Sequence, residues 1–271
     1  MSRRVFDFDR AIVRFPAPSV VSGLSLGLAG APSFDGVLAE HCAYVAALKQ
    51  AGLEVETLPW LDEFPDSLFV EDAAFVIPEG AVILRPGAPS RIDEADAIAP
   101  ALRRRFETVL AVEAGFVDGG DILILPDEIL VGLSARTDRA GAEQFVAHAA
   151  ELGRPARIVP TPLDALHLKS ACALLDEETV IATPTLAAAG IFGRLDVVAT
   201  PGWEVAAANL LRINDVVLVG AGFPRTISLL ADRGFDTVPL PVAEIGRIDA
   251  GLSCMSLRWR AEFPSLGTGR G

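Results

Sequence analysis

The sequence has few cysteines, and none of them lies at a redox or metal-binding spacing. Three cysteines occur in 271 residues, at positions 42, 172 and 254, and no two form a CxxC pair. An odd, widely spaced set in a chain of this length does not make a disulfide framework. We therefore expect reduced thiols and an intracellular protein.

Long apolar runs and an excess of basic residues are also absent. No segment approaches the ~18 consecutive apolar residues that a membrane span requires, and MSRRVFDFD lacks the apolar core of a secretory signal. The 23 basic and 36 acidic residues give a net charge of −13, which argues against a nucleic-acid partner. These absences predict a soluble, cytoplasmic protein that binds a small molecule and neither nucleic acid nor membrane, with a homodimer left open.

What the chain does contain is a repeated hairpin pattern. Four times an apolar run, a short polar turn and a second apolar run follow one another, as AAFVIPEGAVIL, DILILPDEILVGL, ACALLDEETVIAT and ANLLRINDVVLVG. The turns recur about every 40 to 50 residues, a period typical of propellers and other repeat architectures. AIVRFPAP near the start and GLSCMSLRW near the end each supply half of a fifth unit, because the two termini must close a ring that has no free sheet edge. The sequence thus predicts one ring-shaped α/β domain of five units, spanning residues 1–271.

Helix-like segments follow three of these hairpins. Asp138 offers an N-cap for a helix through AEQFVAHAAEL, and Thr226 is expected to begin a helix that Gly234 ends. The segment DEADAIAPALRRRF is a poorer helix, because Pro100 must kink it or end it.

Polar residues interrupt the apolar pattern where the first strand of a unit begins. When the units are aligned on their turns, these places hold Glu71 and Asp72, Asp118, His167 and Cys254, the last in an expected strand. Equivalent positions of a ring face the same axis, so residues far apart in sequence would meet there. A nucleophile, a base and carboxylates are the groups that covalent catalysis uses.

Each of these residues also has a plainer interpretation. A lone cysteine in an apolar strand is usually a small buried hydrophobe, and His167 alone is either a core histidine or a functional base. The glycine pair of DGGD marks either a turn or a close approach of the backbone to a ligand. At least one of Glu71 and Asp72 must point inward, and a buried carboxylate needs a partner such as a substrate cation.

The remaining histidines and cysteines have no such pattern. His41 and His148 lie on helix-like segments with Glu and Gln nearby, which favours solvated side chains. Cys42 and Cys172 are expected to be buried apolar fillers.

Seven segments together resemble a known family. FPDSLFVEDAAFV, ILRPGAPSR, DGGDIL, LSARTD, LHLKS, AGFPRT and GLSCMSLR occur in this order between about residue 10 and residue 260. They resemble the dimethylarginine dimethylaminohydrolase family, which belongs to the guanidino-group-modifying superfamily with the five-bladed α/β propeller (pentein) fold of ββαβ-type units around a central channel. The resemblance implies hydrolysis of N-omega-methylated L-arginine to L-citrulline and dimethylamine or methylamine through a covalent Cys thiouronium intermediate. It also implies that the reaction needs no cofactor and no metal.

The resemblance assigns roles to individual residues. It implies that Cys254 is the nucleophile, His167 the general acid and base, and Asp118 the acid that orients the histidine. The implied substrate contacts are Glu71 and Asp72 with Phe69 at the guanidinium, Arg85 and Arg136 at the α-carboxylate, Asp66 and the carbonyl of Ile248 at the α-ammonium, and Leu24 in a lid.

The chain departs from the family in two places, and other activities stay open. Asp118 stands where relatives often have Glu, which shortens the orienting arm by one methylene, and Asp138 stands where they often have Asn. An arginine deiminase or an amidinotransferase would use the same groups. A binding propeller without catalysis is the alternative outside enzymes.

Overall fold

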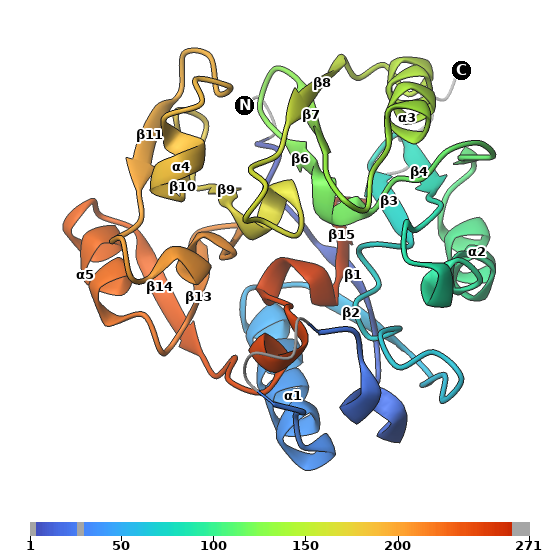
Figure 1. The fold of residues 1–271 in the computed structure, drawn as a ribbon, viewed down its shortest axis with the longest axis horizontal. Helices are drawn as coiled ribbons and strands as arrows, with labels where there is room; N and C mark the ends of the chain where they lie inside the picture. The colour runs from blue at the N-terminus through green and yellow to red at the C-terminus, as the bar shows by residue number, and fades with distance from the viewer. Residues whose placement is uncertain (1–3, 26–29, 262–271) are drawn as a thin grey trace, which may run out of the picture.

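The computed structural model describes residues 4–25 and 30–261, whose strands form five three-stranded sheets. Figure 1 shows these sheets arranged in a ring, with the helices toward its outside. The first four sheets are β3 (Ala74–Ile77), β4 (Gly80–Ile83) and β5 (Val109–Ala111); β6 (Ile122–Ile124), β7 (Ile129–Leu133) and β8 (Ala156–Pro160); β9 (Cys172–Leu174), β10 (Thr179–Ala182) and β11 (Asp196–Ala199); and β12 (Leu211–Ile213), β13 (Val216–Gly220) and β14 (Asp236–Leu240).

The two ends of the chain close the ring, as the sequence predicts. The fifth sheet joins β15 (Leu257–Trp259) to β1 (Arg10–Arg14) and β2 (Glu54–Leu58). β15 runs antiparallel to β1, with Arg10 opposite Trp259, and β2 runs parallel to β1. Every sheet therefore has the same plan, an antiparallel pair followed by a parallel third strand, which confirms the predicted ring of five ββαβ units.

A helix connects the second and third strand of each unit. These helices are α1 (Phe34–Gln50), α2 (Glu94–Arg105), α3 (Arg139–Glu151), the short α4 (Pro184–Ala187) and α5 (Pro224–Asp232). The Asp138 side chain caps α3 by accepting a hydrogen bond from the Gly141 amide, as expected. α5 begins two residues earlier than expected, at Pro224, because proline suits the first helical turn.

Two expectations about helices differ from the structure. α2 continues through Pro100, since both Pro100 and Asp96, whose carbonyl loses its partner, lie on the exposed face where water can satisfy it. α1 buries His41 completely and exposes the neighbouring Cys42, the reverse of the predicted faces. The ring of Phe15, which follows β1, lies 5.9 Å from the His41 ring, so a residue from outside the helix contacts the buried face.

Apolar side chains fill the space between each sheet and its helix. Ile12, Leu48 and Phe145 are fully buried examples, and the Phe145 ring meets Phe75 edge-on at 5.0 Å. Short 3₁₀ turns precede four of the inner strands: η3 (Gly119–Asp121) precedes β6, η4 (Leu168–Ser170) precedes β9, η5 (Val205–Ala208) precedes β12 and η7 (Leu252–Met255) precedes β15. No helix in the described ranges is long and apolar enough to cross a membrane.

Candidate active site

A pocket lies beside the loops that lead into the inner strands. It is lined by Leu24, Ser25, Asp66, Phe69, Asp72, Arg91, Arg136, Leu166, His167, Ile248, Asp249, Ala250 and Cys254. Residues from widely separated parts of the sequence thus share one cavity, and Cys254 and His167 are among them. The charged side chains of Asp66 and Arg136 also line it, so the pocket offers both signs of charge.

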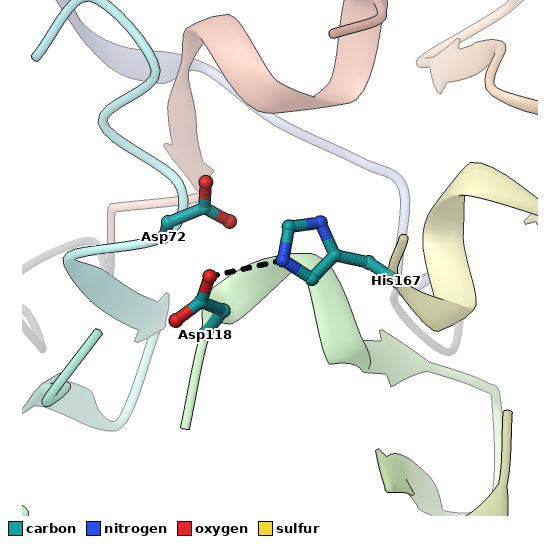
Figure 2. A group of neighbouring side chains, drawn as sticks. All are labelled: Asp72, Asp118 and His167. Carbon is teal, nitrogen blue, oxygen red and sulfur yellow. Dashed lines mark hydrogen bonds and ion pairs between the residues drawn. The ribbon is translucent and has the colours of Figure 1, made fainter. Parts of the chain in front are cut away.

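His167 and Asp118 form a buried ion pair next to this pocket. The Nε2 atom of His167 lies 2.9 Å from Oδ2 of Asp118, as Figure 2 shows. The other carboxylate oxygen of Asp118 accepts a hydrogen bond of 2.7 Å from the Gly87 amide. With both oxygens bound, the shorter aspartate still reaches the histidine, and it fixes the orientation of the imidazole ring.

The glycine pair lets the backbone approach this histidine closely. A Cβ atom on Gly120 would lie 2.7 Å from the ring of His167, and one on Gly119 would lie 1.8 Å from the carbonyl oxygen of Glu71. Neither glycine has a positive φ. The pair therefore serves close packing against His167 and Glu71 rather than a left-handed turn.

Three carboxylates set the charge of His167. Burial lowers the pKa of this histidine, but the attraction of Asp72, the hydrogen bond to Asp118 and the charge of Asp121 outweigh burial and raise the pKa to about 9. Asp121 also holds the histidine loop in place, because its Oδ1 accepts a hydrogen bond of 2.8 Å from the Leu168 amide. His167 is therefore protonated at neutral pH and can donate a proton.

Asp72 faces the pocket and is held by two partners. Its Oδ1 accepts a hydrogen bond of 3.0 Å from the Gly120 amide, and its Oδ2 pairs with Nη1 of Arg91. Burial raises the pKa of Asp72, but the positive charges of Arg91 and His167 lower it by more. The net effect is a lowered pKa, so the carboxylate stays ionised. An ionised, buried carboxylate in a pocket is a binding point for a cation.

Arg85 does not line this pocket, whereas Arg91 does. The Arg85 guanidinium lies 4.4 Å from the ring centre of Phe116 and donates a hydrogen bond to the Gly115 carbonyl. Arg91 binds Asp72 and, through Nε and Nη2, the carboxylate of Glu94. The side chain at the end of a strand therefore packs on an aromatic ring, and the arginine six residues later enters the site.

Groups of opposite charge line another part of the pocket. Asp66 is buried and accepts hydrogen bonds from the Leu24 amide at 3.0 and 3.3 Å. Burial raises its pKa, against the opposing charges of Arg91 and Arg136. The Arg136 guanidinium has no ion-pair partner among the residues that the structure describes. Ile248 lines the same pocket.

Glu71 lines a different cavity from that of its neighbour Asp72. Its Oε1 pairs with Nζ of Lys169 at 2.7 Å and with Nη2 of Arg258 at 3.1 Å. This second cavity has apolar walls from all five inner strands, so it occupies the central channel. The Glu71 amide donates a hydrogen bond to the Cys254 carbonyl, which keeps the residue close to Cys254 although its carboxylate does not line the pocket.

Cys254 lies in the 3₁₀ turn η7 instead of the expected strand. Pairing with β1 begins only at Leu257, so the preceding residues have no strand partner and form a tight turn. Burial, followed by the charges of Glu71 and Asp72, raises the pKa of the Cys254 thiol to about 11. In the resting protein this thiol is therefore neutral.

One group of side chains in the described part of the chain has the spacing of metal ligands. Ligand atoms of Asp72, Asp118 and His167 lie within 4.8 Å of one another. Figure 2 shows that His167 and Asp118 point toward each other, and Asp72 is already paired with Arg91. Hydrogen bonds within the protein thus account for this cluster.

Comparison with known proteins places this site in a family. A model of the arginine deiminase family matches residues 59–201. The N(G),N(G)-dimethylarginine dimethylaminohydrolase of Pseudomonas aeruginosa is 35% identical over 254 residues, which cover 93% of this chain and 100% of that protein. The protein of the same name from Streptomyces coelicolor is 37% identical over 256 residues, covering 93% of this chain and 97% of the relative. The chain belongs to the dimethylarginine dimethylaminohydrolase family.

Solved structures of this family have the same fold. The Pseudomonas aeruginosa dimethylarginine dimethylaminohydrolase, a Cys-to-Ser mutant complexed with citrulline, matches with a TM-score of 0.91 at 35% identity, covering 93% of this chain and 100% of that one. A His-to-Gly dimethylarginine dimethylaminohydrolase, solved as its adduct with S-methyl-L-thiocitrulline, matches with a TM-score of 0.90 at 35% identity over 93% of this chain and 99% of that one. The N-terminal domain of the cyanobacterial arginine dihydrolase ArgZ, at 17% identity and a TM-score of 0.82, shows the fold alone.

In this member of the dimethylarginine dimethylaminohydrolase family, sequence reasoning missed two charged residues. Arg91 lies in the segment ILRPGAPSR and Lys169 in LHLKS, both of which carry the resemblance. Arg91 was missed because Arg85 and Arg136 were both expected to close the second strand of a hairpin, and Arg85 was therefore preferred. Lys169 follows His167 by two residues, and only the structure shows that it pairs with Glu71 and lines the central cavity.

Proposed function

We propose that the protein hydrolyses asymmetric dimethylarginine or monomethylarginine to L-citrulline and the methylated amine. Relatives of this name are 35% and 37% identical over 93% of the chain, and a solved relative binds citrulline. The observation that carries the proposal is a single pocket with Cys254, His167 and Asp72 among its lining residues and Arg136 and Asp66 available for an amino-acid backbone.

The charges of the pocket suit the two ends of such a substrate. Asp72 binds the guanidinium, with Phe69 packed beside it, and Arg136 binds the α-carboxylate. Asp66 and the carbonyl of Ile248 receive the α-ammonium, and Leu24 belongs to the covering loop. Arg91 pairs with Asp72 and so holds the carboxylate that binds the guanidinium. Glu71 stabilises the turn of Cys254 through the hydrogen bond from its amide to the Cys254 carbonyl.

Binding of the cation activates the nucleophile. A guanidinium carbon is a poor electrophile because its charge is spread over three nitrogens, so a thiolate is needed. The substrate cation offsets the carboxylates that raise the pKa of Cys254, and the thiol loses its proton to solvent. The thiolate then attacks the guanidinium carbon and forms a neutral tetrahedral adduct.

His167 completes the first half of the reaction as an acid. Protonated at neutral pH and held by Asp118, it donates its proton to the dimethylamino nitrogen, and the C–N bond breaks to release dimethylamine. A cationic thiouronium remains on Cys254, and His167 is now neutral.

Water completes the second half. His167 takes a proton from a water molecule, whose oxygen attacks the thiouronium carbon. The hydroxyl proton of the adduct passes to the sulfur as the C–S bond breaks, so the ureido group of citrulline forms and Cys254 returns to its neutral thiol. The scheme uses the side chains of this pocket, the neighbouring Asp118 and one water.

The experiment is a side-by-side assay of three substrates. Purified protein is given asymmetric dimethylarginine, monomethylarginine and arginine, and citrulline is measured for each. We expect citrulline from the methylated substrates, with equimolar methylated amine. No citrulline from either would remove the proposal.

The same assay tests a second activity, that of an arginine deiminase. The match of the arginine deiminase family model to residues 59–201 favours it. Arginine turnover that exceeds turnover of both methylated forms would support this reading. A methylated amine released only when a second amine is present would indicate amidino transfer instead.

We also propose a cytoplasmic location. Three free cysteines, one of them the exposed Cys42, suit a reducing compartment. Detection of the protein in a cytosolic fraction with all three thiols titratable after denaturation would support this location, and recovery in an oxidised, exported form would contradict it.

A further inference from the structure

Four of the five units supply a residue to the site from the loop before the inner strand. Asp72 precedes β3, Asp118 precedes β6, His167 precedes β9 and Cys254 precedes β15. The remaining unit is the one that begins with β12 (Leu211–Ile213). Asn209 occupies its corresponding place, at the end of η5 and shortly before β12.

The Asn209 side chain contacts the loop of the nucleophile at two points. Its Nδ2 lies 3.9 Å from Sγ of Cys254 as a hydrogen-bond donor, and its Oδ1 accepts a hydrogen bond of 3.2 Å from the Ser253 amide. The amide therefore bridges the sulfur and the backbone next to it. Hydrogen bonds in resting active sites are often long and shorten when the reacting charge appears.

Gly251 is shaped to receive this amide. A Cβ atom at Gly251 would lie 2.3 Å from Cγ and 2.5 Å from Nδ2 of Asn209. The backbone of Gly251 is extended, so the requirement for glycine comes from close packing and not from strain. The turn that presents Cys254 thus packs directly on the asparagine.

The charges around Cys254 show why a donor is needed there. The carboxylates of Glu71 and Asp72 disfavour a thiolate, and the ammonium of Lys169 favours it. Protonated His167 lines the same pocket. Asn209 is a neutral side chain that donates to the sulfur without adding charge to this group.

We propose that Asn209 is a positioning residue that orients the Cys254 sulfur and donates a hydrogen bond to its thiolate. The inference rests on the proposed role of Cys254 as nucleophile. With Asn209, the unit that begins with β12 also contributes a residue to the site. It concerns the ground state of the thiol, so it can be tested without any substrate.

The test is the pH dependence of alkylation. Iodoacetamide is applied to the whole protein from neutral to alkaline pH, and modification of the Cys254 peptide is followed by mass spectrometry, with the exposed Cys42 as an internal reference. Asn209→Leu removes the donor without adding charge, and Asn209→Asp keeps an acceptor for the Ser253 amide but also lacks the donor. We expect both to move the midpoint upward by about one pH unit, so that Cys254 reacts about tenfold more slowly below the midpoint.

The controls separate a positioning role from a structural one. The chain has one other asparagine, Asn214, whose side chain donates to the carbonyls of Phe8 and Ala51. Asn214→Leu should lower the melting temperature but leave the Cys254 midpoint unchanged. Asn209→Ala replaces the leucine variant if the latter does not fold.

The outcomes are distinct. A midpoint that moves only in Asn209→Asp reports added charge and overturns the inference, as does a neutral variant that slows alkylation equally at every pH. Citrulline formation by the unchanged protein tests the proposed function separately, so failure of one does not imply failure of the other.

Discussion

Two buried histidines of this protein have opposite electrostatic surroundings. His167 lies among Asp72, Asp118 and Asp121, which raise its pKa to about 9 despite burial. His41 lies on α1 beside the ring of Phe15, and burial lowers its pKa to about 4. The first is charged at neutral pH and the second is neutral. Burial alone thus keeps a histidine neutral, whereas carboxylates from other units keep a buried histidine protonated and able to act as an acid.

The largest expected effect separates the two histidines by activity. His167→Gln should lower citrulline formation on the order of 1,000-fold, because both proton transfers of the proposed reaction lose their donor or acceptor. His41→Gln, the matched control, should keep at least a third of the activity per folded molecule. Initial rates with asymmetric dimethylarginine measure both. Equal losses of activity in the two variants would contradict the claim that only His167 takes part in proton transfer.

A smaller effect follows from removing one of the carboxylates. Asp118→Asn should lower activity roughly 10- to 100-fold, since the histidine loses its charged partner. His167 must be protonated to act as an acid, so activity falls as pH rises through its pKa. Loss of the negative charge lowers that pKa, and the alkaline limb of the pH profile should begin about one unit lower. An unmoved limb would mean that Asp118 does not set the charge of His167.

The smallest effect concerns stability in acid. Burial lowers the pKa of His41 from its ordinary value of 6.5 to about 4 in the folded protein, so the unfolded chain binds this proton more tightly. Above pH 6.5 this difference costs the folded protein nothing. As the pH falls the free energy of unfolding decreases, and below pH 4 the loss due to His41 is about 3 kcal/mol. His41→Leu should flatten the difference in unfolding free energy between pH 7 and pH 4.5, measured by urea titration. A variant that loses as much stability as the parent would contradict this assignment.

The ring of five units could be predicted from the sequence because its signals are local. Each hairpin is marked by its own apolar runs and turn residues, and Asn214, at the turn before β13, adopts a φ of 50° that asparagine tolerates. Closure by the two termini followed from counting half-units. The path of α2 through Pro100 did not follow, since it depends on which face of the helix the fold leaves in water.

The sequence predicted which residues belong to the site better than it predicted which cavity each side chain lines. The loops that carry Cys254, His167 and Asp72 were recognised from their repeated position, and all three residues line the pocket. Adjacent Glu71 and Asp72 line different cavities, and Arg91 enters the site where Arg85 was expected. These choices are made outside the regular strands, in the turn before β3 for the two carboxylates and in η2 (Pro89–Arg91) for Arg91, and such turns leave no periodic pattern in the sequence. The burial of His41 likewise involves a contact between segments distant in sequence, since its ring lies beside that of Phe15.

The most direct test of the account is to trap the covalent intermediate. In His167→Gly, attack by Cys254 on S-methyl-L-thiocitrulline would release methanethiol, and the resulting adduct would persist because no base activates water. Peptide mass spectrometry should find the adduct on Cys254, with Cys42 and Cys172 unmodified, and Cys254→Ser should form none. An adduct on Cys42, or a stable adduct that survives in Cys254→Ser, would contradict the claim that sulfur and imidazole from distant segments form one catalytic pocket.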